Sequence, residues 1–503
     1  MEQLLSAEEM KRYDTNTMEH FGVPSCVLME RAAYQTSLHI RNDCHSALIV
    51  CGTGNNGGDG MAIARILHLR GVEVEVVLLG DSDRCSVEAA RQFGILQEYK
   101  IPVEAEIPAK SFDVVIDAIF GIGLSRDIDG IYAQTIEQMN KLEGQKIAID
   151  IPSGIHADNG RIMGTAFCAD LTVTFGYAKY GQLLYPGRAY VGHLVVEDIG
   201  IAKESFLGER PAGHYFSKLD RKLLPLRRND SNKGTYGKVL SVTGSLNMAG
   251  ASLFASQSAY YMGSGLVYVF TPEVNRTIIQ SQLPEAVLCT YDHDKRALHR
   301  SLEEQLERTD VYMVGPGLGQ EALSEEILTI VLECGKKALV LDADGINLIA
   351  KSNKLKDLLK EYKGHLILTP HLKEAARLLG TSVEEIKHDM ITVAKQIAQT
   401  YHGTCVLKDA ATVTVTKSGK IYVNTSGNQA MSKGGSGDVL CGVIGGLIAT
   451  GMQFEMAAAF GVYLHGIAGD VAKEKTGSYS MLARDLMEGL KETIKEMELD
   501  EIL

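Results

Sequence analysis

Residues 47–70 read ALIVCGTGNNGGDGMAIARILHLR and decide the fold of the first half of the chain. The apolar run Ala47–Cys51 predicts a short buried strand, and Met61–Arg70 has the apolar spacing of a helix. Between them lies the glycine-rich loop Gly52–Gly60, which also contains two asparagines and an aspartate. A strand, a glycine loop and a helix in this order are typical of the phosphate-binding turn of a doubly wound α/β sheet.

The alternation of strand and helix continues along the whole chain. Further short strand-like runs are 72–79, 114–119, 147–151, 171–175 and 193–196, and then 239–242, 266–270, 311–314, 338–341, 366–368 and 405–407. Helical segments are expected near 249–262, 321–334, 374–379 and 383–401, and a hairpin at 412–416 and 421–424. Strands separated by helix-length segments indicate βαβ units, so we expect an α/β fold with two three-layer domains.

The pattern lapses between residues 208 and 237, where prolines, glycines and a basic cluster gather. We place the domain boundary there, near residue 217, which gives domains 1–217 and 218–503. No fixed-period repeat relates the two halves. Each half is therefore expected to be an α/β domain with its own core.

Composition excludes several classes of protein. The 503 residues carry a formal net charge of -13, which argues against a nucleic-acid or anionic-membrane binder but leaves room for a nucleotide site. Nine scattered cysteines without a Cys-x-x-Cys motif indicate reduced thiols and a cytoplasmic location. The first residues form no apolar leader, and the apolar stretch 439–452 is shorter than the roughly 20 residues that span a bilayer, so we expect a buried helix there.

Polar side chains follow three strand-like runs in the first half. The loop Gly52–Gly60 is neither Gly-x-Gly-x-x-Gly nor a Walker A motif, so it is either a ligand loop of another kind or a plain turn. Asp117 and Asp150 end two further runs, and Ser153 follows the second. Because the carboxyl ends of parallel strands meet in one crevice, Asn56, Asp117 and Ser153 could surround one hard cation. Alternatively, each aspartate caps the turn that follows it.

The second half carries its clearest motif at Gly434–Asp438, just before the apolar helix expected from Val439. Free backbone amides at a helix start form an anion hole for a transferring phosphoryl group. Asp438 would then accept the proton of an attacking hydroxyl. The alternative is that Asp438 is only the N-cap of the helix.

Together, the first-half motifs Asn55–Gly60, Asp117–Gly121 and Asp150–Gly154 resemble the NAD(P)HX epimerase domain, over about residues 5–215. The resemblance implies a Rossmann-like fold, potassium on Asn56, Asp117 and Ser153, and Asp150 as the acid/base. It implies substrate contacts from Asn55, Asn56, Gly57, Gly58, Asp59, Gly121, Ile122, Gly123, Leu124, Ser125, Arg126, Asp127, Tyr132 and Asp150.

The Gly434–Asp438 loop, with Gly315–Gly319, resembles the ribokinase superfamily. Further motifs narrow the resemblance to the ADP-dependent NAD(P)HX dehydratase over about residues 225–500: Thr369-Pro370-His371 with Glu374 and Arg377, Lys408 followed by Asp409–Thr412, and Gly427-Asn428 before Met431. This implies substrate contacts from Gly250, Ala251, Gly317, His371 and the catalytic Asp438. It also implies nucleotide contacts from Lys408, Asp409, Ala410, Ala411, Thr412 and Gly437, with magnesium accompanying ADP.

Two residues of this set are less straightforward. The dehydratase family usually has glycine after the lysine, where this chain has Asp409. A carboxylate beside phosphates is unfavourable unless it points away or binds a metal. His371 on its own would be an ordinary loop histidine, and only the adjoining Thr-Pro and Glu374 favour a site.

Both halves therefore point to one substrate in two epimeric forms. The first domain would interconvert the R and S hydrates of NADH or NADPH, and the second would dehydrate the S form with ADP, giving AMP and phosphate. We also expect a homo-oligomer, a tetramer or larger, and the acidic net charge leads us to expect no nucleic-acid or membrane partner. One alternative is an ATP-dependent kinase for a vitamin precursor or sugar with a regulatory N-terminal half. Another is that the N-terminal half is a non-catalytic scaffold.

Overall fold

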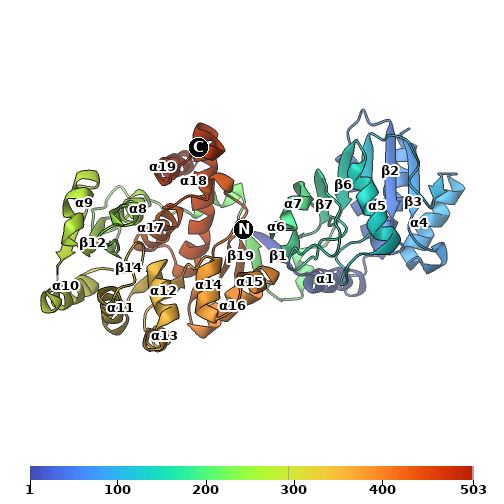
Figure 1. Cartoon of the computed structure of the whole chain (residues 1–503). Coiled ribbons are helices and arrows are strands. Elements are labelled where there is room, and N and C mark those ends of the chain that lie inside the picture. Colours follow the sequence, from blue (N-terminus) through green and yellow to red (C-terminus); the bar gives the residue numbers. More distant parts are fainter. Residues whose placement is uncertain (293, 501–503) are drawn as a thin grey trace. The chain divides into compact units, whose positions relative to one another are not determined.

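The computed structural model describes residues 1–292 and 294–500. The chain divides into two compact units, Gln3–Gly213 and a second unit of His214–Leu503 together with Met1–Glu2 (Figure 1). The strand β10 (Gly213–Tyr215) lies at this division, close to the expected boundary. Among the described residues, no helix is both long enough and apolar enough to cross a membrane.

The N-terminal unit is built on a parallel sheet of seven strands in the order β4-β3-β2-β5-β6-β7-β9. The strands are β2 (Ser46–Cys51), β3 (Glu73–Leu78), β4 (Val103–Glu104), β5 (Val114–Ala118), β6 (Gln145–Ile149), β7 (Leu171–Phe175) and β9 (His193–Glu197). Outside this set, β1 (Glu2–Leu5) pairs in parallel with β8 (Ala178–Lys179).

Helices cover both faces of this sheet, so its central strands are buried on both sides. In β2, Ile49 and Cys51 belong to one apolar cluster and Leu48 and Val50 to another. The first cluster includes side chains of α2 and α3, and the second includes those of α5. The helices are α1 (Ala7–Glu19), α2 (Ser25–Leu38), α3 (Asn55–Leu69), α4 (Val87–Glu98), α5 (Gly130–Lys141), α6 (Tyr180–Leu183) and α7 (Arg188–Val191).

The C-terminal unit contains strands in the order β13-β12-β11-β14-β15-β16-β17-β18-β19. They are β11 (Lys238–Val242), β12 (Leu266–Pro272), β13 (Val287–Tyr291), β14 (Val311–Val314), β15 (Ala338–Leu341), β16 (Leu366–Leu368), β17 (Thr404–Leu407), β18 (Val413–Val415) and β19 (Ile421–Val423). The first seven in this order are parallel, and β17, β18 and β19 pair antiparallel. The expected parallel sheets and the expected hairpin are confirmed.

Two helical layers enclose this sheet, as Figure 1 shows. One layer holds α8 (Ala249–Tyr261), α17 (Ser436–Ala449), α18 (Phe454–Ser480) and α19 (Ala483–Asp500). The other holds α11 (Ala322–Cys334), α12 (Asp344–Lys351), α13 (Asn353–Lys360), α14 (Leu372–Leu379), α15 (Val383–His388) and α16 (Met390–Thr400), while α9 (Arg276–Gln282) and α10 (Lys295–Arg308) lie near β12 and β13. The expected buried helix after Val439 is confirmed as α17, packed so closely on α8 that a Cβ at Gly442 would collide with the Ala255 carbonyl oxygen.

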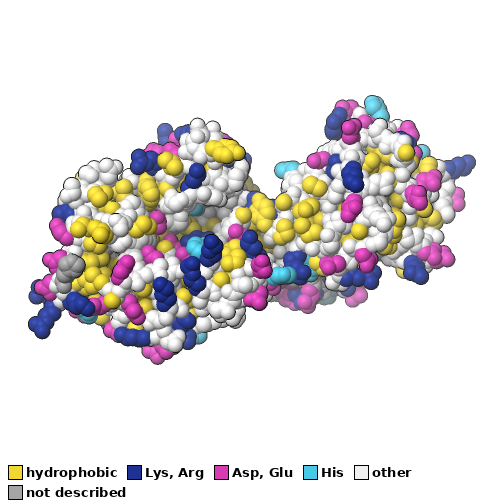
Figure 2. Space-filling model, in the orientation of Figure 1, with side chains coloured by type: hydrophobic (Ala, Val, Ile, Leu, Met, Phe, Trp, Pro, Cys, Tyr) yellow, Lys and Arg dark blue, Asp and Glu magenta, His cyan; other side chains and the backbone are white. Residues whose placement is uncertain are grey.

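Several details differ from the sequence-based expectation, among them the short strands β1, β4, β8 and β10. The helix expected over 383–401 is two helices, because Asp389 leaves helical geometry and its side chain accepts a hydrogen bond from the Thr392 amide as an N-cap. The strand β13 was not expected either, and most of its residues are only partly buried. On the visible face of each unit, acidic and basic side chains are interspersed (Figure 2).

Candidate functional site

The N-terminal unit contains a cavity of about 880 Å³ at the carboxyl ends of its central strands. Its walls come from α1, α2, the start of α3, the loop after β5, and the segments around Asp150 and Lys179. The expected substrate residues that line it are Asn55, Asn56, Asp59, Gly121, Ile122, Gly123, Leu124, Ser125, Arg126, Tyr132 and Asp150. Asp127, Gly57 and Gly58 are not among the lining residues.

The glycine loop starts a helix directly, as expected of a ligand loop. Gly54 is the N-cap of α3 without any side-chain cap, so the first amides of the helix have no intrahelical acceptor. A Cβ at Gly57 would collide with the Gly52 carbonyl oxygen, and one at Gly58 would press on Met29 and Ala89. Gly57 and Gly58 therefore make the tight packing of the loop possible and do not contribute cavity surface.

Asp117 and Ser153 meet in the structure. Ser153 donates to Asp117 through its hydroxyl at 2.6 Å and through its amide at 2.7 Å, and the Ile119 amide donates to the same carboxylate at 3.2 Å. Asp117 is fully buried, and burial raises its pKa to about 6 although these hydrogen bonds oppose the shift. No basic side chain among the described residues contributes to that shift, so no cation in this part of the chain balances the carboxylate charge.

Asn56, the third expected cation ligand, approaches the same loop. A Cβ built on Gly121 would lie 3.4 Å from Asn56 Oδ1, and Asn56 Nδ2 is buried without a hydrogen-bond partner. The turn-cap alternative is also partly correct, since Asp117 accepts from the Ile119 amide two residues on. A buried carboxylate without a counter-ion beside an amide oxygen fits a hard cation with oxygen ligands, whereas the unpaired Asn56 Nδ2 is a hydrogen-bond donor and is not itself a ligand.

Asp150 occupies the crevice with a buried lysine. It follows β6 with φ +63°, a conformation unusual for a residue with a side chain. Lys179, 1% exposed, donates to Asp150 Oδ1 at 2.5 Å, and Thr174 donates to the same oxygen at 3.0 Å. The Gln182 side chain holds the Asp150 backbone carbonyl. The carboxylate is thus fixed at the cavity wall as half of an ion pair.

Other carboxylates also line this cavity, and two of them have a raised pKa: Asp14 from α1 and Asp59 from α3. Burial, and then the charge of Asp150, raise the pKa of Asp14. Burial also raises the pKa of Asp59 well above its ordinary value, with the charges of Asp150 and Asp14 adding to the effect. The sequence offered no local signal for Asp14 or Lys179, because neither follows a glycine loop or ends a strand of the main sheet.

In the C-terminal unit, the glycine motif forms the first turn of α17. Gly435 is the N-cap with φ +96°, and Val439 donates the first hydrogen bond of helical spacing to Gly435. The amides of Gly437 and Asp438 precede that bond and are free to bind an anion. The N-cap alternative for Asp438 is wrong, since this residue lies within the helix.

Lys408 lies beside this turn and is held there by a buried aspartate. Its Nζ is 2.5 Å from Asp342 Oδ1, which also accepts from Thr369 at 2.7 Å. A Cβ built on Gly437 would lie 3.5 Å from Lys408 Nζ. Burial opposes the charged form of Lys408, but Asp342 and Glu374 outweigh it and raise its pKa. An ammonium group is therefore fixed next to the anion-binding amides.

Asp438 faces the same group of charges. Burial and the negative charge of Asp342 raise its pKa to about 7, and Lys408 only partly offsets them. A carboxyl with a pKa near neutrality can exchange a proton at physiological pH. This is the property expected of the catalytic base.

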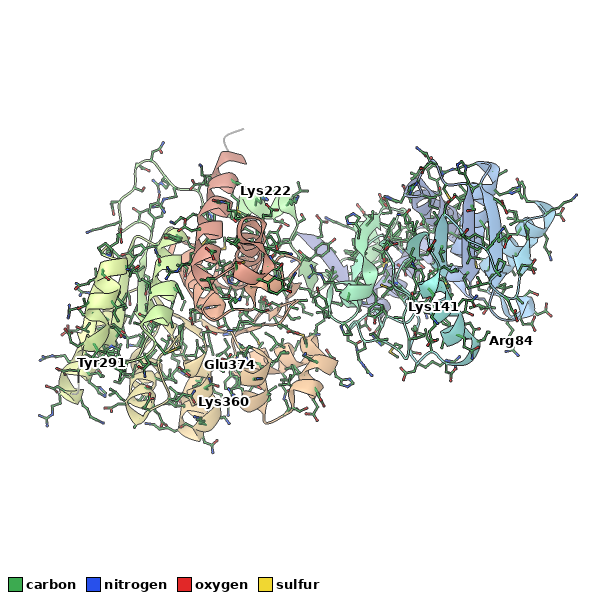
Figure 3. The ribbon with its side chains drawn as sticks, turned by 45° about the horizontal axis from the view of Figure 1, so that its top comes forward. Arg84, Lys141, Lys222, Tyr291, Lys360 and Glu374 are labelled. Atoms are coloured by element: carbon green, nitrogen blue, oxygen red, sulfur yellow. The ribbon has the colours of Figure 1, made fainter. Side chains whose placement is uncertain are left out.

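His371 has a structural role in addition to its expected one. Its Nδ1 accepts from the amides of Lys373 and Glu374 and so caps α14, while Glu374 accepts from the His371 amide. Glu374, labelled in Figure 3 in the first turn of α14, is 4% exposed, and burial raises its pKa to about 7. His371 forms a parallel β-bridge with Lys408, and Lys408 acts on the pKa of both side chains, so His371 and Glu374 lie near the Gly434–Asp438 turn, called the phosphate turn below.

The remaining expected residues differ in position. Gly317, with φ +61°, packs on Ala251, and space is open around Gly250. Asp409 and Ala410 are exposed after Lys408, whereas Ala411 and Thr412 are buried. The carboxylate of Asp409 can thus extend into solvent, which removes the conflict expected from its place in the motif.

Helix α18 contacts the phosphate turn through a buried histidine. The buried His465 bonds through Nε2 to the Ser436 carbonyl at 2.9 Å, and burial lowers its pKa to about 4, so it is neutral. Asp470 accepts from the Gly427 amide and from the Asn428 side chain. His465 and Asp470 were not expected. Asp342 was not expected either, but it follows β15 just as Asp150 follows β6, and the same rule applied there would have found it.

Among the described residues, no group of three or more His, Cys, Asp or Glu side chains is arranged to hold a metal ion. A hard-ion site built from one carboxylate, an amide and a hydroxyl, as at Asp117, differs from such a cluster.

Comparison with known proteins covers both units. Residues 239–492 match the family model described as NAD(P)H-hydrate dehydratase, and residues 25–181 match that of the YjeF-related protein N-terminus. Bifunctional NAD(P)H-hydrate repair enzymes of Thermofilum pendens and Moorella thermoacetica are each 36% identical, covering 98% of this chain and 96% and 97% of their own lengths. A solved structure of a hypothetical protein from Streptococcus mutans is 28% identical, with a TM-score of 0.50, covering 56% of this chain and 99% of its own.

These matches span both halves in one chain, and they favour two linked activities over a lone kinase with a regulatory domain. The α/β class of both halves, expected from the strand and helix pattern, is confirmed. The chain belongs to the family of bifunctional NAD(P)H-hydrate repair enzymes.

Proposed function

We propose that this chain repairs hydrated NADH and NADPH in two steps, with an epimerase in residues 1–217 and an ADP-dependent dehydratase in residues 218–503. The observation that carries the proposal is the C-terminal phosphate turn. It combines free amides at Gly437 and Asp438, an ammonium group on Lys408, and a carboxyl whose pKa is about 7 on Asp438.

In the dehydratase, Asp438 takes the proton from the hydroxyl of the S hydrate, whose oxygen attacks the terminal phosphorus of ADP. The new P–O bond forms as the bond to AMP breaks, and the turn amides and Lys408 stabilise the charge on the transferred group. The carbon–oxygen bond then breaks with loss of phosphate, and the neighbouring carbon loses a proton. The ring double bond is restored, so the products are NADH or NADPH, AMP and phosphate.

Magnesium would accompany the nucleotide. Mg²⁺ is usually held by substrate phosphates and one or two carboxylates, and not by a cage of protein ligands. Asp342 pairs with Lys408, and its charge raises the pKa of Asp438. These two carboxylates would hold the magnesium ion together with the phosphates. When bound, the ion would neutralise the phosphate charge.

In the epimerase, we propose that the dinucleotide lies in the 880 Å³ cavity against the Asn55–Asp59 turn. Asp150, held by Lys179, exchanges a proton with the hydrate. We further propose that Asn56, Asp117 and Ser153 hold potassium, which would balance the buried charge of Asp117 and order the loop that carries Gly121.

The test of the dehydratase half uses the purified S hydrate with ADP. We expect nicotinamide absorbance to recover together with one AMP and one phosphate for each hydrate consumed. Release of ADP from ATP with phosphate remaining on an organic acceptor would instead support the small-molecule kinase. ATP in place of ADP, at equal magnesium, measures the nucleotide preference in the same assay.

A further inference from the structure

We propose that Asp14 is a second proton-transfer group of the N-terminal site, which works with Asp150 when the hydrate is epimerised. This inference rests on the proposed epimerase function. Asp14 belongs to α1, outside every motif that indicated the site, and its side chain lines the same cavity as Asp150.

Helix α1 is held firmly enough to position a reacting group. A capping box between Ser6 and Glu9 fixes its start. On the buried side, the Tyr13 hydroxyl donates to Glu209 at 3.0 Å and Thr17 shares a 2.7 Å hydrogen bond with Ser205. These contacts, at Tyr13 and Thr17, lie before and after Asp14 in the sequence, so they hold the part of α1 from which Asp14 faces the cavity.

The Asp14 carboxylate has no protein partner to explain its position. No hydrogen bond or ion pair joins it to any residue that the structure describes, although it is half-buried. The other half-buried acid of this helix, Glu9, belongs to the capping box. The carboxylate oxygens of Asp14 are therefore open to the cavity, where an unpaired acid is available to act on a ligand.

The reaction needs two such groups. Hydration of the dihydronicotinamide ring places the hydroxyl on a carbon bonded to the ring nitrogen. To invert this carbon, an acid protonates the leaving hydroxyl, the C–O bond breaks as the nitrogen lone pair forms an iminium ion, and water departs. Water then adds to the other face and gives its proton to a base. One proton is delivered and one is accepted, so the acid and base exchange states in each turnover and exchange roles in the reverse direction.

The electrostatics separate the two carboxyls. Asp150 is paired with the Lys179 ammonium, whereas burial and the charge of Asp150 favour the protonated form of Asp14. Two carboxyls in such different surroundings are suited to opposite roles. The charged groups that line the cavity around Asp14 are Glu8, Lys11, Asp59, Glu88, Arg126, Asp150 and Lys179.

The experiment measures conversion of the R hydrate into the S hydrate by the full-length chain without ADP, with the epimers separated by chromatography. Asp14→Asn is compared with Asp14→Glu, with Asp59→Asn, and with Glu19→Gln, which removes an exposed acid from the end of the same helix. We expect Asp14→Asn to lower kcat by about 10²–10⁴-fold with little change in KM, and Asp14→Glu to restore part of it. Glu19→Gln should match the wild type.

The pH profile distinguishes a proton donor from a structural residue. Wild-type kcat/KM should fall as pH rises through the pKa of Asp14, and the residual rate of Asp14→Asn should lack this fall. The inference is overturned if Asp14→Asn keeps more than about a tenth of kcat, if it keeps the alkaline fall, or if Asp59→Asn removes that fall instead. A wild-type chain that does not interconvert the epimers at all would overturn the proposed epimerase itself.

Discussion

Lys408 and the buried Asp342 form an ion pair, 2.5 Å between Nζ and Oδ1, directly beside the turn that starts α17. Lys408 follows β17 and Asp342 follows β15, and β16 lies between these two strands in the sheet. The pair fixes the ammonium next to Gly437, where a phosphate would bind. The ion pair therefore connects the fold of the C-terminal unit to its proposed chemistry.

Removing Asp342 should destabilise the protein, because it takes the ion-pair partner from the partly buried Lys408 charge and leaves only the charge of Glu374 to balance it. We expect Asp342→Ala to lower the free energy of unfolding by about 3–5 kcal/mol. Asp357→Ala breaks the exposed Lys360–Asp357 pair on α13 and should cost less than about 1 kcal/mol. Urea denaturation of both variants measures the difference, and equal costs would show that the buried pair has no special role.

Asp438→Asn should abolish dehydration and leave epimerisation intact. The loss should be about 10²–10⁴-fold, the usual contribution of a general base. Because the pKa of Asp438 is about 7, wild-type dehydration should increase as pH rises through 7 and the base loses its proton.

Glu374 has a similar pKa of about 7, so it provides the control for this pH dependence. The increase should persist in Glu374→Gln and be absent from the residual rate of Asp438→Asn. The base assignment is wrong if Asp438→Asn retains more than about a tenth of the wild-type rate.

Potassium should activate epimerisation and stabilise the chain in a pH-dependent way. The folded-state pKa of Asp117, about 6, lies above its ordinary value of 3.8. Its contribution to stability is therefore fully present below pH 3.8 and is lost as pH rises through 6, when the buried carboxylate becomes charged. Potassium should offset this loss, so it should raise Tm more at pH 8 than at pH 5.

The variant Asp117→Ala should remove both potassium effects, whereas Asp43→Ala, which removes an exposed acid paired with Arg41, should keep them. Choline replaces potassium in the reference buffer, and zinc chelators should have no effect. Equal rates and Tm values in potassium and choline would eliminate the cation and leave Asp117 as a turn cap joined to Ser153.

The two units should function apart, provided that the cut comes before His214. Phe216 is 3% exposed, and its ring lies 5.5 Å from that of Tyr422 and 5.4 Å from those of Phe460 and Tyr463. A fragment 218–503 lacks this aromatic contact, and loss of a buried Phe side chain typically costs about 3–5 kcal/mol. Fragment 214–503 should therefore melt at a higher temperature than fragment 218–503, and identical melting curves would contradict the role of Phe216.

Much of the architecture followed from local sequence because strands, glycine turns and helices each have a short-range signal. Asp150 and Asp438 were found because they directly follow a strand and a glycine turn, and Asp117 was found because it ends a strand-like run. Lys179 and Asp14 could not be found in this way, since only the folding of α1 and β8 around the cavity brings them to Asp150. The same limit applies to His465, which reaches the phosphate turn from the middle of α18.

One error had a local cause. The long helix expected over 383–401 overlooked Asp389, a good N-cap in the middle of a helical pattern. The boundary expected near residue 217 lies close to the division at His214, but composition cannot reveal that Phe216 packs among the aromatic rings of β19 and α18.

The central claim is that one chain carries out both steps, and a mixture of the R and S hydrates tests it most directly. With ADP and magnesium, the wild-type chain should restore nicotinamide absorbance for the whole mixture. Asp150→Asn should restore only the S fraction rapidly, with the R epimer remaining, and Asp438→Asn should restore neither. Rapid recovery of only the S fraction by the wild-type chain, or full rapid recovery by Asp150→Asn, would contradict the account.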